Sequence, residues 1–225
     1  MNIFTFWEGA MPAYIRLCMD KWKMPFTLLT YENLHRYTDL DIDKIKRFTL
    51  PHVSDIVRVH VLRDCGGYWL DADTVLITGQ LPETEMVGDP ENRTVSIGLL
   101  WAEANSKMMV EWAEYQDAII DSESIPNHWA AFGNLFCDTY VKEHEEIRIH
   151  PILEYMPEKY MLRNDLPHYQ QFKEFYFSKS FSLADIKETD LLMLHNSWVP
   201  DWYKELTKAE VLMERCTLSN ILRGS

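Results

Sequence analysis

The segment from Ser54 to Ile77 constrains the fold more than any other part of the sequence. Ser54 can cap a helix that continues to a pair of glycines, Gly66 and Gly67, which suit the end of a helix. The residues from Tyr68 to Ile77 are apolar on both sides of two aspartates, and this predicts a buried strand. A helix followed closely by a buried strand favours an α/β fold with a largely parallel sheet.

The same alternation of elements continues along the chain. Strands are expected over Ile3–Trp7, Phe26–Tyr31, Thr94–Leu100, Ile147–Ile149 and Leu191–Leu194, and helices after Pro12 and over Met108–Ile120, His128–Val141 and Lys208–Leu222. We find no internal repeat and no linker in the sequence. We therefore expect residues 1–225 to form a single domain, in which residues up to about 100 bind the main ligand and residues from about 101 to 225 complete the site.

Charge and composition exclude several classes of protein. The formal net charge is −13, which argues against a nucleic-acid binder because such proteins neutralise phosphates with cations. No segment approaches the roughly 20 consecutive apolar residues that cross a bilayer, and the first residues do not resemble a signal peptide. The four cysteines lie far apart in the sequence, which favours reduced thiols in the cytoplasm. We expect a cytoplasmic protein with no transmembrane segment, and leave open a peripheral contact with the inner face of the membrane.

The two aspartates of the expected strand, Asp71 and Asp73, are two residues apart. On an extended backbone their side chains would leave the same face and repel each other. A divalent cation would relieve that repulsion, and oxygen ligands suit Mg²⁺ or Mn²⁺, which usually take further ligands from phosphates. The alternative is a strand end at which both carboxylates point into water.

Three neighbouring side chains strengthen the functional interpretation. Asp55 and Arg58 lie three residues apart on one face of the preceding helix, and Trp69 shares the face of the strand that carries the aspartates. The two glycines would let the helix end approach the strand closely. The alternative is a solvated Asp55–Arg58 ion pair and a tryptophan that only fills the core.

The combination of Ser54-Asp55-Ile56-Val57-Arg58 with Gly66-Gly67-Tyr68-Trp69-Leu70-Asp71-Ala72-Asp73 resembles the signature of nucleotide-sugar glycosyltransferases with the GT-A fold. The most similar groups are the DXD sugar-binding and capsular polysaccharide synthesis transferases, and the glucosylating toxins of clostridia are more distant. Weaker agreement extends to Phe6-Trp7-Glu8-Gly9 and His195-Asn196-Ser197-Trp198. The fold that the resemblance implies is a GT-A, Rossmann-like α/β domain.

The resemblance also implies roles for individual residues. Asp73 would bind Mn²⁺ or Mg²⁺ directly, and Asp71 would hold the ribose and donor sugar hydroxyls and contact the metal through water. Asp55 with Arg58 would contact the donor sugar and its diphosphate. These four residues are the expected catalytic set, and Trp69 would line the nucleotide-sugar pocket. Trp7 would stack on the base, His195 would be a late metal ligand, and Ser197 with Trp198 would close over the diphosphate.

The expected activity is metal-dependent transfer of a sugar from a nucleotide-diphosphate donor, with UDP-sugars favoured, to a glycan or lipid-linked glycan acceptor. The resemblance implies retention of anomeric configuration and a role in bacterial surface polysaccharide synthesis. The segment from His128 to Asn134 departs from the family, where a Thr-Gly-Pro segment is common, so no acceptor-side residue is assigned.

Two other functions fit parts of the pattern. Leu70-Asp71-Ala72-Asp73-Thr74-Val75 also matches the first motif of haloacid-dehalogenase-like phosphatases, with Asp71 as nucleophile and Asp73 as acid or base. Gly88-Asp89-Pro90-Glu91 is a poor match to the later acidic motif that those enzymes need. A non-catalytic carbohydrate-binding module would use the many aromatic residues for sugar stacking, independently of metal and nucleotide.

Overall fold

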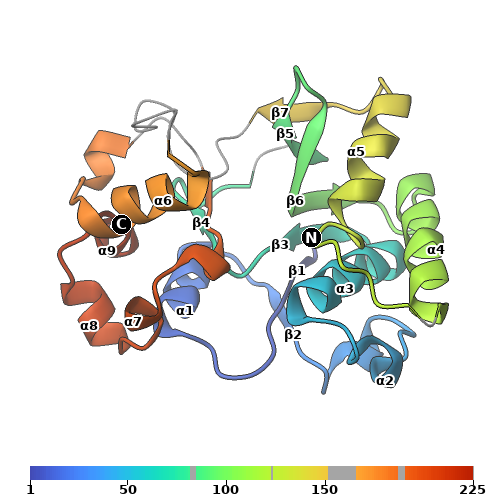
Figure 1. Cartoon of the computed structure of the whole chain (residues 1–225), viewed down its shortest axis with the longest axis horizontal. Coiled ribbons are helices and arrows are strands. Elements are labelled where there is room, and N and C mark those ends of the chain that lie inside the picture. Colours follow the sequence, from blue (N-terminus) through green and yellow to red (C-terminus); the bar gives the residue numbers. More distant parts are fainter. Residues whose placement is uncertain (82–84, 123, 152–165, 187–190, 225) are drawn as a thin grey trace. The chain divides into compact units, whose positions relative to one another are not determined.

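The computed structural model describes residues 1–81, 85–122, 124–151, 166–186 and 191–224 (Figure 1). The chain divides into two compact units. The first, here called the sheet unit, comprises Met1–Gly9, Pro25–Asp71 and Glu83–Pro151. The second, here called the helical unit, comprises Ala10–Met24, Ala72–Pro82 and Ile152–Ser225. The expected division of a single domain at about residue 100 stays a prediction.

The sheet unit contains a six-stranded sheet with the order β2-β1-β3-β6-β5-β7. The strands are β1 (Ile3–Phe6), β2 (Thr27–Leu29), β3 (Gly67–Leu70), β5 (Met86–Asp89), β6 (Thr94–Ala102) and β7 (Ile149–Pro151). β1 pairs in parallel with β2 and β3, and β5 pairs in parallel with β7. β6 runs antiparallel to its neighbours β3 and β5. The sheet is therefore mostly parallel, which confirms the predicted α/β class and is consistent with a Rossmann-like GT-A fold.

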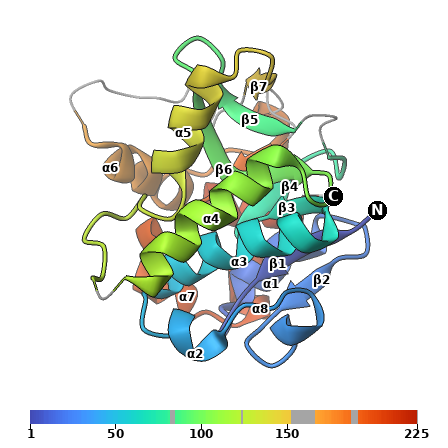
Figure 2. The same ribbon diagram turned by 90° about the vertical axis from the view of Figure 1, so that its right-hand side faces the viewer.

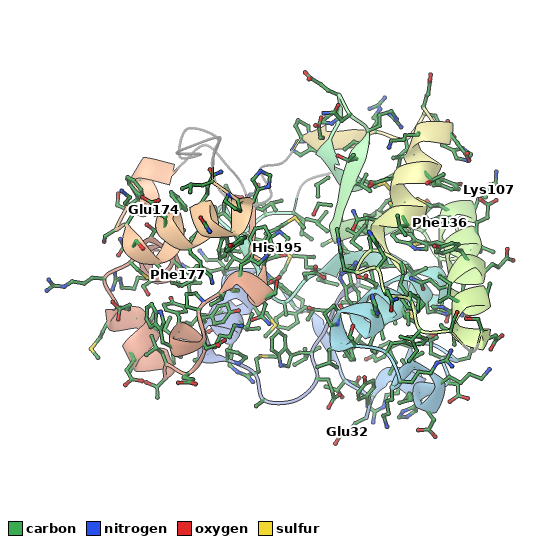
Figure 3. The ribbon with its side chains drawn as sticks, in the orientation of Figure 1. Glu32, Lys107, Phe136, Glu174, Phe177 and His195 are labelled. Atoms are coloured by element: carbon green, nitrogen blue, oxygen red, sulfur yellow. The ribbon has the colours of Figure 1, made fainter. Side chains whose placement is uncertain are left out.

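Helices cover this sheet. Those of the sheet unit are α2 (Ile42–Ile45), α3 (Leu50–Cys65), α4 (Lys107–Asp121) and α5 (Asn134–Glu143). α3 contacts β1, β3 and β6, and α4 lies beside α3, as Figure 2 shows. α4 in turn contacts α5, where the rings of Trp112 and Phe136 stack with centroids 5.5 Å apart (Figure 3). These contacts bury an apolar core that includes Trp69 and Trp112, both fully buried.

The two glycines after α3 are needed for a close approach of backbone segments. Gly66 and Gly67 have φ angles of +60° and +111°, which side chains rarely allow. A Cβ atom at Gly66 would lie 2.6 Å from the backbone nitrogen of Ala104, and one at Gly67 would lie 2.5 Å from the carbonyl oxygen of Asn2. The two glycines therefore let the end of α3 pass close to the residues after β6 and before β1.

The helical unit contains a two-stranded antiparallel sheet surrounded by short helices. Its elements are α1 (Ala13–Asp20), β4 (Thr74–Leu76), α6 (His168–Lys173), a π-helical turn (Glu174–Ser178), a 3-10 turn (Leu183–Ile186), β8 (Leu191–Met193), a second 3-10 turn (Asn196–Trp198), α7 (Asp201–Lys204), α8 (Lys208–Met213) and α9 (Thr217–Arg223). β4 pairs with β8. Trp22 is fully buried and its Nε1 donates to the Thr74 carbonyl at 2.9 Å, which ties the end of α1 to β4.

The prediction of one strand over Tyr68–Ile77 was wrong. The chain forms β3, then turns at Ala72 and Asp73, and then forms β4, which belongs to a different sheet. The last sheet bond of the first part runs from the Asp71 N–H to the Gly98 carbonyl at 2.8 Å. Aspartate is a poor strand former and a good turn former, so the local preference of the two acids prevails over their apolar surroundings. The two carboxylates are therefore not set on one face of a single strand.

Three helix boundaries also differ from the predictions. α3 begins at Leu50 after Thr49, with Pro51 in its first turn, where a proline is tolerated because no intrahelical N–H is needed. Ser54 is therefore inside the helix and does not cap it. The helix expected over His128–Val141 begins only at Asn134, and the one expected over Lys208–Leu222 is two helices, α8 and α9.

Two strands also differ from the predictions. The strand expected at Ile147–Ile149 is β7, shifted to Ile149–Pro151. β5 was not expected, because Met86–Asp89 is short and contains a glycine and an acid. Among the residues that the structure describes, no helix has the length and apolar character needed to span a membrane.

Candidate functional site

The centre of the candidate site in the sheet unit is the buried guanidinium group of Arg58. Asp55 and Arg58 lie about one turn apart on α3, and Arg58 Nη1 donates to Asp55 Oδ1 at 2.8 Å. Arg58 Nη2 donates to Asp71 Oδ1 at 2.6 Å. The side chain of Arg58 is only 3% exposed, against 14% for Asp55 and 33% for Asp71. One arginine therefore joins the helix to the end of β3, and the cluster reaches solvent at Asp71.

Trp69 supports the same carboxylate. Its Nε1 donates to Asp71 Oδ1 at 2.8 Å, so this one oxygen accepts hydrogen bonds from both Arg58 and Trp69. The guanidinium carbon lies 5.2 Å from the centre of the indole ring, within the range of a cation–π contact. The predicted grouping of Asp55, Arg58, Trp69 and Asp71 is present, and Trp69 is both a core residue and a partner of the site.

The cluster carries two carboxylates against one guanidinium. Burial raises the pKa of Asp55 to about 7, since the opposing attraction of Arg58 is weaker than the loss of hydration and Asp71 adds repulsion. Burial by itself would lower the pKa of Arg58, but Asp71 and Asp55 raise it above its ordinary value. Arg58 is thus held charged, and a further cation or hydrogen-bond donor near the carboxylates would be stabilised.

Residues that the sequence did not lead us to predict bind the backbone at Asp55 and at Phe132. Gln116 on α4 is fully buried, and its Nε2 donates to the backbone carbonyls of Asp55 at 3.1 Å and Phe132 at 2.6 Å. Trp112 Nε1 also donates to the Phe132 carbonyl, at 3.0 Å. The next residue, Gly133, is tightly packed, because a Cβ atom there would lie 2.4 Å from Ile97 Cδ1 and 3.0 Å from Asp55 Oδ2. Gln116 could have been identified from the sequence, because it is a polar residue on the apolar face of α4.

Trp7 follows the carboxyl end of β1 and belongs to the same unit. Its backbone N–H donates to the Leu29 carbonyl at 3.1 Å, which extends the pairing with β2. β1 and β3 are parallel, with Phe4 opposite Trp69, so Trp7 and Asp71 lie at the same edge of the sheet. Ligands of open α/β sheets bind at this edge. The side chain of Trp7 is half-buried, and its Nε1 has no hydrogen-bond partner among the described residues.

Asp73 belongs to the helical unit, where the C-terminal part of the chain holds it. Its Oδ2 accepts the backbone N–H of Asn196 at 2.8 Å, and its carbonyl accepts the N–H of Leu194 at 3.4 Å. The Tyr14 hydroxyl donates to Asn196 Oδ1. Burial raises the pKa of Tyr14 well above its usual range, with Asp73 adding to the effect, so the hydroxyl stays a neutral donor.

The other predicted residues of the helical unit follow β8, on both sides of Asn196, whose N–H bonds Asp73. His195, labelled in Figure 3, directly precedes the 3-10 turn Asn196–Trp198. The rings of His195 and Trp198 have centroids 4.3 Å apart, and the Trp198 N–H donates to the His195 carbonyl at 2.8 Å. Ser197, between them, is exposed. The structure therefore brings Asp73, His195, Ser197 and Trp198 together.

The predicted metal ligands belong to different units, Asp71 to the sheet unit and Asp73 with His195 to the helical unit. Among the described residues, no three His, Cys, Asp or Glu side chains are grouped so as to hold a metal ion. The donor chemistry fits a hard cation, because carboxylate oxygens suit Mg²⁺ and Mn²⁺. Metal binding by these residues stays a prediction.

Comparison with known proteins completes the description. No curated protein matches the chain. The model of one protein family, described as capsular polysaccharide synthesis protein, matches residues 1–190. The match begins before β1 and ends directly before β8. It includes Trp7, the Arg58 cluster and Asp73. With most of its length matched, the chain belongs to the capsular polysaccharide synthesis protein family.

Proposed function

We propose that this protein is a glycosyltransferase that moves a sugar from a nucleotide-diphosphate sugar to a glycan or lipid-linked glycan during surface polysaccharide synthesis. Family membership suggests a glycosyltransferase-like role in that process. The observation that carries the proposal is the buried Arg58, which holds Asp55 and Asp71 in fixed positions at the ligand-binding edge of an α/β sheet.

The site suits a donor that has hydroxyl groups and a diphosphate. Asp71 is one-third exposed, and its Oδ2 accepts no hydrogen bond from the described residues, so it can accept one from a ribose or sugar hydroxyl. Asp55, which is one helical turn from Arg58 on α3, offers a second acceptor. Trp7 presents an aromatic ring at the same edge, on which we propose that the base stacks. UDP-sugars are the donors we expect.

We propose that Asp73, assisted by Asp71 and His195, holds Mn²⁺ or Mg²⁺. Asp71 Oδ1 already accepts two hydrogen bonds, so Asp73 is the main ligand in this proposal. When bound, the metal would neutralise charge that develops on the leaving diphosphate. In this proposal Arg58, whose Nη1 and Nη2 bond Asp55 and Asp71, would hold these carboxylates in place beside the donor sugar and its diphosphate.

The remaining parts of the proposal concern the closing of the site and the stereochemical outcome. Ser197 and Trp198 would close over the diphosphate, and excluding water would prevent hydrolysis of the donor. We propose retention of anomeric configuration, with the leaving phosphate accepting the proton of the acceptor. No side chain is assigned as the base. We expect the protein to work in the cytoplasm, where nucleotide sugars and lipid-linked acceptors meet at the inner face of the membrane.

The experiment that tests the proposal is a thermal-shift screen of the full chain with nucleotide sugars, in the presence and absence of Mn²⁺. A ligand that binds the native state raises the melting temperature. We expect a UDP-sugar to stabilise the protein only with metal, and Asp73→Asn to abolish this effect while the unliganded melting temperature changes little. Stabilisation by no nucleotide sugar, or equal stabilisation of Asp73→Asn, would contradict the proposal.

The phosphatase alternative is weaker because its nucleophile would be Asp71. Both Arg58 and Trp69 donate to Oδ1 of this carboxylate, and these hydrogen bonds reduce its nucleophilicity. Asp89, from the poor later motif, accepts the backbone N–H groups of Glu91 and Asn92 within its own turn. A binding module that ignores nucleotide and metal would show sugar-dependent stabilisation alone in the same screen.

A further inference from the structure

A cavity lies in the sheet unit, on a part of α3 that the candidate donor site does not use. Its volume is about 230 Å³, and it is bordered by the segment that leads into α2, by α3 and by α4. The α3 residue that faces it, His60, is five positions from Asp55 and thus about 140° around the helix. Leu40, Ile45 and Ile120 give the cavity an apolar part.

The charges around this cavity are mostly negative. Four aspartates line it, against one lysine and one arginine. Three of the four have their own partners. Asp121 pairs with Lys44 at 2.7 Å, Asp39 accepts from Arg63 at 3.0 Å, and Asp41 accepts the N–H groups that begin α2. Both cations of the cavity are therefore already paired.

The fourth aspartate, Asp117, faces a buried histidine. His60 is 2% exposed, and neither of its ring nitrogens has a hydrogen-bond partner among the described residues. Its Nε2 lies 3.5 Å from Asp117 Oδ1, which is half-exposed. Burial lowers the pKa of His60 to about 4, with Arg63 adding to the effect, so the imidazole is neutral at physiological pH and one nitrogen can accept a hydrogen bond. Buried polar atoms normally have partners, and the lack of one here calls for a ligand.

We propose that this cavity binds a small organic ammonium ion, which donates hydrogen bonds to Asp117 and His60. Nε2 of His60 is buried and is an acceptor when the ring proton is on Nδ1. Asp117 is half-exposed, and a small shift of its side chain would let one ammonium nitrogen lie within hydrogen-bond distance of both the carboxylate and Nε2. The carboxylate provides the opposite charge and a charge-assisted bond. The apolar side chains of Leu40, Ile45 and Ile120 suit the carbon chain of an alkyl amine.

The same features favour an ammonium ion over a metal. Zinc sites use three or more protein ligands as a rule, and the described residues hold no such group of His, Cys, Asp or Glu. The cavity offers two acceptors that are not already engaged, and an ammonium ion can use two while its third N–H points to water. The proposal goes beyond glycosyl transfer and does not depend on it.

The test is isothermal titration of the full chain with putrescine, which carries two ammonium groups. Its uncharged analogue 1,4-butanediol tests the need for charge, and glucosamine tests whether a sugar amine is preferred to an alkyl amine. Asp117→Asn removes the charge of a half-exposed side chain and keeps its shape. Glu114→Gln removes a charge from an exposed position of the same helix outside the cavity, and is the matched control.

We expect saturable binding of putrescine or glucosamine, and the tighter of the two identifies the source of the amine. Asp117→Asn should weaken it about tenfold, or about 1.4 kcal/mol at 25 °C, while Glu114→Gln leaves it unchanged. In the wild-type protein the amine should also shift the ¹⁵N resonances of the His60 ring, a readout that needs no variant. No saturable binding, equal binding of butanediol, or equal binding by Asp117→Asn would overturn the proposal. Zn²⁺ or Mn²⁺ binding that Asp117→Asn abolishes, with no response to amines, would also overturn it.

Discussion

Arg58 Nη2 lies 2.6 Å from Asp71 Oδ1, and this bond joins the middle of α3 to the residue that ends β3. Because Nη1 of the same guanidinium bonds Asp55, neither carboxylate can move without disturbing the other. The bond therefore fixes the separation of the two acidic groups to which we assign the donor sugar.

Arg58→Met should destabilise the protein strongly. The substitution puts an apolar side chain of similar length in place of the cation of Asp55 and of the partly exposed Asp71, and breaking a buried ion pair typically costs about 3–5 kcal/mol. Arg16→Gln, at an exposed position of α1, should change stability by less than about 0.5 kcal/mol. Urea unfolding followed by circular dichroism measures both. Equal urea midpoints for Arg58→Met and Arg16→Gln would show that the Arg58 cluster does not stabilise the fold.

The raised pKa of Asp55 predicts a pH dependence of stability with a definite sign. A carboxyl whose pKa is about 7 in the folded protein, above its value of 3.8 in the unfolded chain, binds its proton more tightly when folded. Its contribution is therefore fully present below about pH 4 and is lost as the pH rises to about 7, by up to about 4 kcal/mol. Asp55→Asn should reduce this loss between pH 4 and 7. If the free energies of unfolding of the wild type and of Asp55→Asn change equally with pH between 4 and 7, the raised pKa of Asp55 is contradicted.

Gly133→Ala tests the packing of the loop before α5 on Asp55. The new Cβ would lie 2.4 Å from Ile97 Cδ1 and 3.0 Å from Asp55 Oδ2. We expect a loss of about 1–3 kcal/mol from overpacking, together with weaker stabilisation by the donor. Adding Ile97→Val removes the atom that the Cβ meets first and should recover part of the stability. If the loss of stability in the double variant equals the sum of the losses in the two single variants, Ile97 is not the source of the strain.

Tyr14→Phe tests whether the contacts of Asp73 prepare it for metal. The hydroxyl bonds Asn196, whose N–H bonds Asp73, and loss of such an outer contact typically lowers metal affinity about 10–100-fold. Tyr203→Phe is the matched control, because Tyr203 is equally buried, packs 5.7 Å from Tyr14 and bonds Ser219 instead. Free Mn²⁺ measured by electron paramagnetic resonance gives the affinity. Equal affinities for the two variants would remove Tyr14 from any role at the metal.

The sequence allowed prediction of the sheet class and of the Asp55, Arg58, Trp69 and Asp71 group, because each depends on residues close together in the chain. Helical spacing placed Asp55 beside Arg58, and strand spacing placed Trp69 beside Asp71. The bond between Arg58 and Asp71 was not predicted, although only a tight glycine turn separates their elements.

Features that depend on long-range packing could not be predicted. Gln116 reaches a carbonyl 61 residues away, and the close contact of Gly133 with Asp55 depends on the fold of three segments. The turn at Ala72 and Asp73 was missed because the apolar residues on both sides matched a single strand. The partner of β4, which is β8, lies more than a hundred residues later and leaves no local signal.

The indole of Trp69 has a use that follows from its hydrogen bond to Asp71. Any molecule that engages that carboxylate will alter the electric field at the ring, so this side chain is a natural sensor of occupancy. Fluorine-labelled tryptophan would give a separate nuclear magnetic resonance signal for each of the eight indoles, and the Trp69 signal can be assigned by substitution. Ligand screening could then proceed without any knowledge of the acceptor.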